Sequence, residues 1–392
     1  MASIPLTQAK FLTEFQCLGG DCEDTCCKGW GMQLTQETVD KYKKDAPELL
    51  DAVTSGEAEH IMRRDEETDY CIKFDKGWCG IHAKYGTEFL GDACHFFPRV
   101  TRQLGDKTSM TASLSCPEVA RLTLLAENGF APIETETDRV PFSLKDYVTD
   151  DMPAEKAWEL HQFFLHAVGD ESITPERAVG RLRSLSESLS RLPKSSWPEA
   201  AAFYWKSADG IAVPSEPNPV DPFNLLNALQ GLIGAARPSK RDRLMETIGD
   251  MEKALKVKLN WETLGIQLAD DSAQASADMW AAWDASYAKH FAPFLHRWLQ
   301  AQLSVGMFPF AGLAETMQEK VTLLGVRLAT LKLALASACA VKGEAIDDAQ
   351  AIRIVQSLAR FLDHLADPTL SLQIYTETGW VKEARLRGLL AD

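Results

Sequence analysis

Eight of the nine cysteines lie before residue 117 of a 392-residue chain. These eight are Cys17, Cys22, Cys26, Cys27, Cys71, Cys79, Cys94 and Cys116. Thiolates are ligands for zinc and for iron–sulfur clusters, and paired thiols can instead form disulfides. The ninth cysteine, Cys339, stands in the apolar run LALASACA, where a thiol behaves as a small core side chain. The segregation therefore predicts a cysteine-dependent task for the N-terminal part of the chain.

The spacing of the eight cysteines leaves three interpretations open. Disulfides fit an even count, but they do not persist in a reducing compartment. Zinc favours two closely spaced pairs, and Cys22-x3-Cys26 supplies only one; His82 and His95 could replace the more widely spaced later cysteines. An iron–sulfur cluster accepts four thiolates from separated segments, and glycine- and aromatic-rich surroundings suit it. Spacing alone thus indicates a metal or cluster protein.

Several function classes lack their sequence signatures here. The C-x3-C-x2-C pattern of radical S-adenosylmethionine enzymes is absent, because Gly29 occupies its third cysteine position. No G-x-G-x-x-G fingerprint follows a strand pattern, and no P-loop is present. A formal net charge of −15 argues against nucleic acid as a partner. We find neither a secretory signal pattern nor a run of about 18 apolar residues, so we expect a cytoplasmic protein without a transmembrane segment.

The hydrophobic pattern predicts a mostly α fold. Hydrophobic residues make up 45% and charged residues 25% of the chain, as in a globular protein with a sizeable core. We expect an irregular, cysteine-rich metal- or cluster-binding module packed on a multi-helix body, and we find no competing alternating strand pattern. The expected divisions are a cysteine-rich module at 1–120, a helical region at 121–210 and a C-terminal helical domain at 221–392, after a proline-rich linker at 207–222.

Local signals predict where individual helices begin and end. Thr35 is expected to cap a short helix, and Ser115 a second helix that opens with Pro117 and ends at Gly129. The segment APIETETDR is then expected to be a polar connection. Apolar residues at steps of three and four predict further helices. Their ranges are 150–170, 173–192, 223–237, 241–259, 275–303, 313–341 and 347–365.

The order of the cysteine motifs resembles that of a known family. FQCLGGDCEDTCCKGW is followed by a cysteine pair, by CHFFPR and by SCPEVARLTLL, as in the FliB-type flagellin lysine N-methylases, which belong with the wider YkgJ-like cysteine-cluster proteins. The likeness continues in HFAPFLHRWLQAQLSVGMFPF and IRIVQSLARFLDHL. It implies methyl transfer from S-adenosylmethionine to flagellin lysines in the cytoplasm. It also implies a 4Fe-4S cluster on the cysteine motif, which maps onto all eight N-terminal cysteines.

Nothing in the sequence decides which four cysteines would hold the cluster; our choice is Cys22, Cys27, Cys79 and Cys94. A lysine must be neutral to attack a methyl sulfonium, yet its free pKa is about 10.4, so a base or desolvation is needed. Candidate groups near the cysteines are Asp21, Glu23, Asp24, Asp92, His82 and His95. Trp30, Trp78 and Arg99 are candidates for contacting S-adenosylmethionine, although core packing suits both tryptophans. The alternative function is protein binding without methylation, by a helical module whose cysteine-rich part is held together by zinc or by an iron–sulfur cluster.

Overall fold

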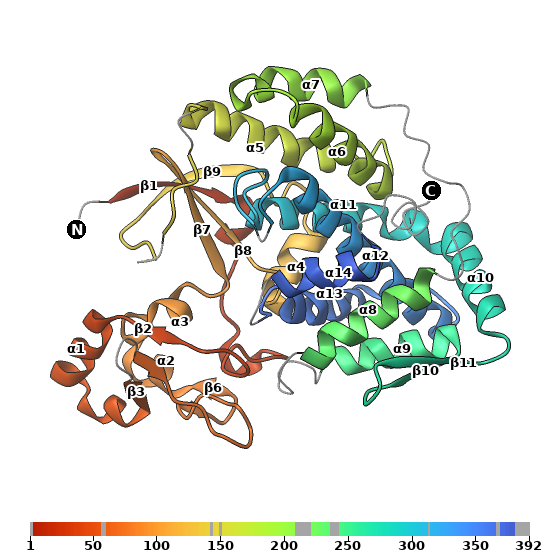
Figure 1. Cartoon of the computed structure of the whole chain (residues 1–392). Coiled ribbons are helices and arrows are strands. Elements are labelled where there is room, and N and C mark those ends of the chain that lie inside the picture. Colours follow the sequence, from red (N-terminus) through yellow and green to blue (C-terminus); the bar gives the residue numbers. More distant parts are fainter. Residues whose placement is uncertain are drawn as a thin grey trace.

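The computed structural model describes residues 3–55, 60–141, 144–148, 151–207, 221–235, 243–312, 314–365 and 369–380. Figure 1 shows three parts: a small lobe at the lower left, a sheet above it, and a body of helices on the right and at the top. We call residues 17–98 the cysteine lobe. The predominance of helix agrees with the sequence, whereas the sheet was not expected.

The helical body accounts for most of the chain. Its helices are α4 (Pro117–Leu125), α5 (Ala154–Val168), α6 (Pro175–Leu189), α7 (Trp197–Ser207), α8 (Asp221–Ala235), α9 (Leu244–Leu255), α10 (Ser272–Ala282), α11 (Ala288–Val305), α12 (Met317–Lys342), α13 (Asp348–Leu362) and α14 (Thr369–Glu377). A π-helical turn at Trp283–Tyr287 joins α10 to α11. One continuous apolar core runs through these helices and the sheet. Burial of this core is the main force that stabilises the body.

Helix α12 lies at the centre of the body. It begins with a capping box between Thr316 and Glu319, and it packs against α6, α9, α10 and α13. By length and composition alone it could cross a membrane, but 83% of its apolar stretch is buried inside the protein. Cys339 is fully buried in this helix, which confirms its predicted role as a core residue. Helix α12 is therefore the core helix of the body.

A four-stranded sheet lies between the lobe and the helices. It comprises β1 (Ile4–Ala9), β7 (Arg99–Leu104), β8 (Lys107–Ala112) and β9 (Pro132–Thr137), in the order β7-β8-β1-β9. Strands β1 and β8 run parallel, and the other neighbours run antiparallel. The expectation of a polar connection at APIETETDR is wrong, because this segment contains β9. As an edge strand facing solvent, β9 needs little apolar content, and its charged side chains protect the edge.

The cysteine lobe is built from short elements around a small core. They are β2 (Gln33–Leu34), α1 (Gln36–Asp45), β3 (Val53–Ser55), β4 (His60–Met62), β5 (Phe74–Asp75), β6 (Trp78–Cys79), α2 (Gly80–Tyr85) and α3 (Asp92–Phe96). The Thr35 side chain accepts a hydrogen bond from the Thr38 amide at 3.2 Å, which confirms the predicted cap of α1. The small core includes Cys27 and Cys71 beside residues such as Tyr42 and Leu49. Thiols are thus part of what this lobe packs around.

Two of the predicted helices have different boundaries in the structure. Helix α4 begins after Cys116, with no side-chain cap, because the Ser115 hydroxyl contacts Ser113 instead; the helix also ends at Leu125, before Gly129. The helix expected at 241–259 stops at Leu255, and Lys256 takes a left-handed conformation. The chain then forms the hairpin of β10 (Val257–Asn260) and β11 (Gly265–Leu268), where alternation favours a strand. Most of the predicted linker, 208–220, lies outside the described residues, and the predicted domain divisions stay predictions.

Candidate metal centre and cofactor cavity

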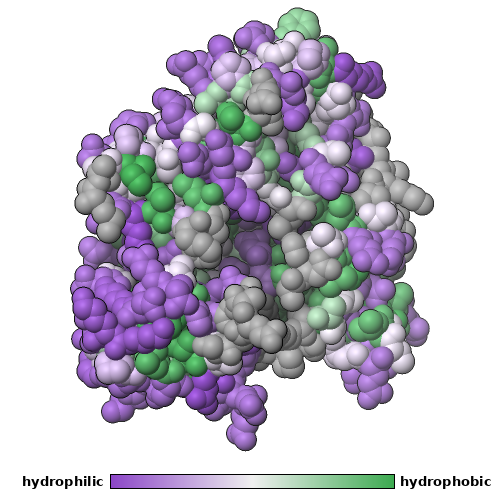
Figure 2. Space-filling view, turned by 60° about the vertical axis from the view of Figure 1, so that its left-hand side comes forward, coloured by the Kyte–Doolittle hydropathy of each residue, from purple (hydrophilic) through white to green (hydrophobic). Residues whose placement is uncertain are grey.

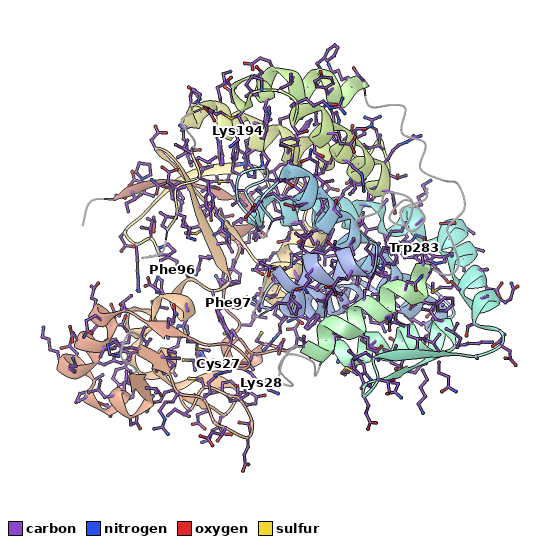
Figure 3. The ribbon with its side chains drawn as sticks, viewed as in Figure 1. Cys27, Lys28, Phe96, Phe97, Lys194 and Trp283 are labelled. Atoms are coloured by element: carbon purple, nitrogen blue, oxygen red, sulfur yellow. The ribbon has the colours of Figure 1, made fainter. Side chains whose placement is uncertain are left out.

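One cavity gathers the N-terminal thiols. It has a volume of about 430 Å³, within the range of roughly 300–1,000 Å³ typical of ligand sites. Seven cysteines line it: Cys17, Cys22, Cys26, Cys27, Cys79, Cys94 and Cys116. The eighth, Cys71, is buried beside them, and its amide donates to the Cys27 carbonyl at 2.8 Å. Figure 3 shows Cys27 and Lys28 at the edge of the lobe that faces the helical body.

Different elements bring these sulfur atoms together. Cys22, Cys26 and Cys27 lie on the loop that leaves the turn Gly19–Asp21, and the Thr25 hydroxyl accepts a hydrogen bond from the Cys27 amide at 3.1 Å. Strand β6 and helices α3 and α4 carry the others. Segments that are far apart in the sequence therefore converge on one wall.

The cysteine thiols of the cavity differ in their pKa values. Hydrogen bonds between the Cys27 thiol and the sulfur atoms of Cys26 and Cys79 lower the pKa of Cys79 to about 6 and also lower that of Cys26. The same hydrogen bonds raise the pKa of Cys27. Burial raises the pKa of the Cys22, Cys71 and Cys94 thiols, and that of Cys116 to about 12. Cys26 and Cys79 are thus the sulfurs most readily present as thiolates, the form that binds metals.

The wall fits a thiolate-ligated group in its chemistry. All nine cysteines are free thiols, so the disulfide interpretation finds no support. Within the described ranges, no three or more His, Cys, Asp or Glu side chains form a ready-made site for a single metal ion. The sulfurs instead surround a cavity, and aromatic rings, among them Trp30 and Phe97, form part of its wall.

Aromatic side chains form another part of the wall. The Trp30 indole donates to the Cys26 carbonyl and packs against Phe97 and His364, with ring centroids 5.2 Å and 5.5 Å away. The Trp78 ring covers Gly19, where a Cβ would lie 3.0 Å from the indole. Gly19 also has a φ of +56°, so both the close indole and the left-handed backbone favour glycine at this position. Trp78 remains 44% exposed. Hydrophilic residues predominate at the lower left of Figure 2, and the surface is hollowed near the centre of this view.

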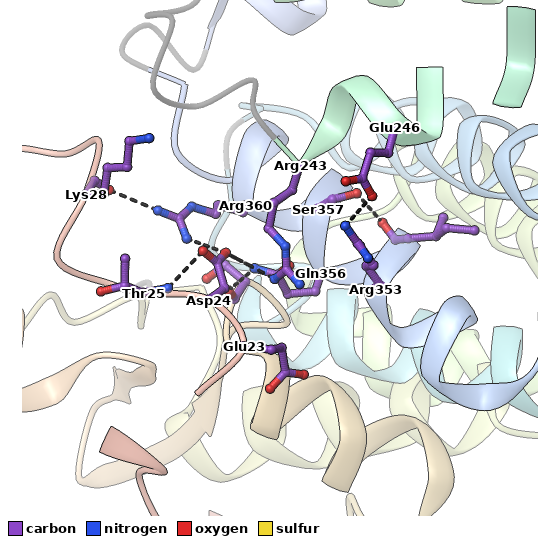
Figure 4. Close-up of polar contacts among 12 residues, drawn as sticks. Glu23, Asp24, Thr25, Lys28, Arg243, Glu246, Arg353, Gln356, Ser357 and Arg360 are labelled. Atoms are coloured by element: carbon purple, nitrogen blue, oxygen red, sulfur yellow. Dashed lines mark hydrogen bonds and ion pairs between the residues drawn. The ribbon is translucent and has the colours of Figure 1, made fainter. Parts of the chain in front are cut away.

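A polar network fastens the cysteine loop to α13 (Figure 4). The Asp24 carboxylate pairs with Arg360 and with Arg243, the latter at 3.4 Å, and accepts a hydrogen bond from Gln356 at 2.8 Å. Arg360 also donates to the Lys28 carbonyl at 3.1 Å. Burial alone would raise the pKa of Asp24, but Arg360 and Gln356 hold it below its ordinary value. Asp24 is therefore ionised and structurally engaged, which makes it a poor proton acceptor.

The other candidate residues divide between the wall and the periphery. His82 and His95 line the cavity, as do Trp30, Trp78 and Arg99. Asp21, Glu23 and Asp92 are not part of the wall. Glu23 pairs with Arg121 at 2.7 Å, and Asp92 pairs with Arg139.

Sequence reasoning did not assign several polar residues of the wall to the site. Arg360, His364 and Ser115 line the cavity, and His364 Nε2 lies 3.1 Å from the Ser115 hydroxyl. The apolar stripe of α13 predicted its buried face correctly. The i, i+4 spacing of Arg360 and His364 was the available signal that both could meet one neighbour.

Comparisons with known proteins address the C-terminal half. Residues 205–377 match the family profile described as the FliB lysine N-methylase C-terminal domain. This part of the chain is similar to the C-terminal domain of the FliB-type lysine N-methylases. The matched residues include both Arg360 of α13 and His364, which follows that helix, and both line the cavity. The match supports the family resemblance that the sequence motifs indicated.

Individual relatives agree with this assignment. The lysine-N-methylase of Salmonella typhimurium is 28% identical over 132 residues, and that of Salmonella choleraesuis is 30% identical over 132 residues. Each alignment covers 30% of this chain and 32% of the relative, so the similarity spans about a third of those proteins. The flagellar biosynthetic protein FliU of Salmonella muenchen is 27% identical over 129 residues, which cover 76% of that protein. No solved structure matches the chain.

Proposed function

We propose that this protein transfers methyl groups from S-adenosylmethionine to lysine ε-amino groups of flagellin, in the cytoplasm, and that an iron–sulfur cluster occupies the cysteine-lined cavity. One observation carries the proposal. The part of the chain related to lysine N-methylases contributes Arg360 and His364 to the same wall as seven cysteines. A cavity shared in this way links the lysine methylation for which this family is named to the thiol chemistry of the lobe.

The reaction needs a neutral lysine. Its nitrogen lone pair attacks the methyl carbon, the carbon–sulfur bond breaks, S-adenosylhomocysteine leaves, and the nitrogen then loses a proton. A lysine that enters this cavity would exchange water for aromatic rings and would face the positively charged sulfonium of the methyl donor. Desolvation and a neighbouring positive charge both lower a lysine pKa. The wall therefore favours the reactive form of the substrate.

The cluster assignment rests on the donor set. Cys22, Cys27, Cys79 and Cys94 all line the cavity and would hold a 4Fe-4S cluster, with zinc as the alternative occupant. When bound, such a group would supply iron and cross-link loops of the lobe that share little apolar core. The surrounding chain would keep water from it through Trp30 and Phe97. No four-cysteine set is favoured by bond geometry.

The test combines metal analysis with a methylation assay. Full-length protein purified without oxygen should contain iron and inorganic sulfide, and should add methyl groups to flagellin lysines in the presence of S-adenosylmethionine, as read by peptide mass spectrometry. Omission of S-adenosylmethionine is the control. Cluster-loaded protein that leaves flagellin unmodified would overturn the enzyme proposal. Colourless zinc protein that binds flagellin without modifying it would support the alternative binding module.

A further inference from the structure

Among the residues that the structure describes, no carboxylate pairs with Arg99, a cation of the cavity wall. Arg99 is the first residue of β7, and its guanidinium lies 5.2 Å from the centroid of the Phe15 ring. Its charge interacts with the Cys17 thiol and with His95. Burial lowers the pKa of Arg99, yet an arginine stays protonated at neutral pH. The wall thus holds a half-buried positive charge that faces the space where a ligand would lie.

The second arginine of the wall differs in this respect. The charge of Arg360 is balanced by Asp24, and its remaining donors contact the Lys28 carbonyl. Burying an unbalanced charge costs free energy, so proteins normally retain one only where a partner arrives. Arginine is also the residue best shaped to hold a carboxylate through two parallel hydrogen bonds. The contrast between the two arginines points to an anionic ligand group at Arg99.

We propose that Arg99 binds the carboxylate of the amino-acid part of the methyl donor. The inference rests on the proposed function, because that function requires S-adenosylmethionine in this cavity. The remaining chemistry of the wall fits the same ligand. Trp30 and Trp78 also line the cavity, and aromatic rings stack on purines and attract sulfonium cations. Arg99 is accordingly a binding residue for the donor.

The experiment compares two ligands that differ in the amino-acid part. S-Adenosylhomocysteine carries the carboxylate, whereas 5′-methylthioadenosine keeps the adenosine and thioether and lacks it. Both are titrated calorimetrically into cluster-loaded, full-length wild-type protein and the R99Q variant. We expect R99Q to weaken the binding of S-adenosylhomocysteine by about 10- to 100-fold, because hydrogen bonds to a charged group are lost. Binding of 5′-methylthioadenosine should change by less than about twofold, because only the carboxylate contact is removed. R99K should recover part of the loss.

Arg102 supplies the matched control. It lies on the same strand, its guanidinium is 5.9 Å from the centroid of the Tyr147 ring, and it does not line the cavity. R102Q should leave the affinity for both ligands unchanged, and iron content is measured for every variant.

The possible outcomes separate the inference from the function on which it rests. If R99Q weakens the binding of both ligands equally, or of neither, the proposed function is unaffected and the carboxylate assignment is wrong. Loss of iron in R99Q would overturn it too, and would assign Arg99 to the Cys17 side of the cavity. Wild-type protein that binds neither S-adenosylhomocysteine nor S-adenosylmethionine would contradict the proposed function itself.

Discussion

The cysteine lobe and the helical body reach a folded state by different means. The body buries a continuous apolar core along long helices, of which α12 has 26 residues. The longest helix of the lobe, α1, has 10 residues, and the small core of the lobe includes thiols. Little buried apolar area gives little stability, and small units of this kind usually need a metal or cross-links. The comparison teaches that the body is stabilised by hydrophobic burial, whereas the lobe has a small core and would gain stability from the cluster proposed for its cysteines.

The largest expected effect comes from removing one thiol of the lobe. The Cys27 thiol is hydrogen-bonded with the sulfur atoms of Cys26 and Cys79, so C27A removes the thiol that links the other two. We expect iron per chain to fall more than about tenfold, with faster proteolysis of the lobe, because metal binding there is folding free energy. Metal analysis and limited proteolysis measure both effects.

The same change in the body is the control. Cys339 is fully buried in α12, so C339A should cost about 1–2 kcal/mol of unfolding free energy by leaving a small cavity, while iron content stays as in the wild type. If C27A keeps its iron, or if C339A loses it, the division of roles between lobe and body is wrong.

Breaking a buried ion pair of the body should also lower the free energy of unfolding. Lys332 of α12 pairs with Glu176 of α6 at 2.6 Å, and their side chains are only 3% and 8% exposed. K332M leaves Glu176 buried without its partner, so we expect a loss of about 3–5 kcal/mol in unfolding free energy. Urea denaturation followed by circular dichroism measures it.

A double variant sharpens this test. In K332M/E176L neither charge remains, so most of the lost stability should return. Iron content should stay unchanged in both variants, because the pair belongs to the body. A cost below about 1 kcal/mol for K332M would show that the pair is not held away from water as the structure indicates.

The sequence predicted the body better than the lobe, for a physical reason. Apolar residues at helical spacing determine which face of a helix is buried, as for Leu182 and Leu185 of α6, so each stripe is a local signal. Strand β9 carries no such signal, since exposed glutamates alternate with half-buried threonines at a sheet edge. Its pairing with β1 joins residues over 120 positions apart, and local patterns do not encode such pairings.

The candidate site shows the same limit. Residue type and segregation predicted that the cysteines form a site, and the structure gathers seven of them around one cavity. The contribution of α13 could not be predicted, because Asp24 meets Arg360 only through tertiary packing, 336 positions along the chain. The nearest acidic residues in the sequence, Asp24 among them, seemed equally suited to proton transfer. Their ion pairs, which only the fold reveals, distinguish them.

The junction between lobe and body can be tested through Asp24. D24N removes the charge that balances Arg360 and Arg243 at a largely buried position. We expect a loss of about 1–3 kcal/mol in the local opening free energy of residues 22–28 and of α13, as for unsatisfied buried charged groups. Hydrogen exchange with mass spectrometry measures this.

The neighbouring Glu23 is the control. The side chains of its ion pair with Arg121 are about 40% exposed, and surface ion pairs contribute little to stability. E23Q should therefore change the same local opening free energies by less than about 0.5 kcal/mol. Equal effects of the two variants would mean that Asp24 does not connect the lobe to the body.

The smallest expected effect is a pH dependence confined to the body. His161 of α5 is buried, and its Nδ1 lies 2.9 Å from the Phe308 carbonyl. Burial lowers its pKa to about 4, against 6.5 in the unfolded chain. Between these values the unfolded chain binds more protons than the native protein, so this contribution to stability is present above pH 6.5 and is lost as the pH falls. From pH 8 to pH 5.5 the loss should be about 1 kcal/mol.

Asparagine at position 161 retains an N–H donor but does not titrate, so H161N should remove about 1 kcal/mol of the stability difference between pH 8 and pH 5.5, as measured by urea denaturation. H166N, at an exposed position of the same helix, should leave that difference as in the wild type. The comparison between variants is needed because many carboxylates also respond to acid. An unchanged pH dependence in H161N would show that His161 can be protonated within the folded body, and hence that the core around α5 admits water.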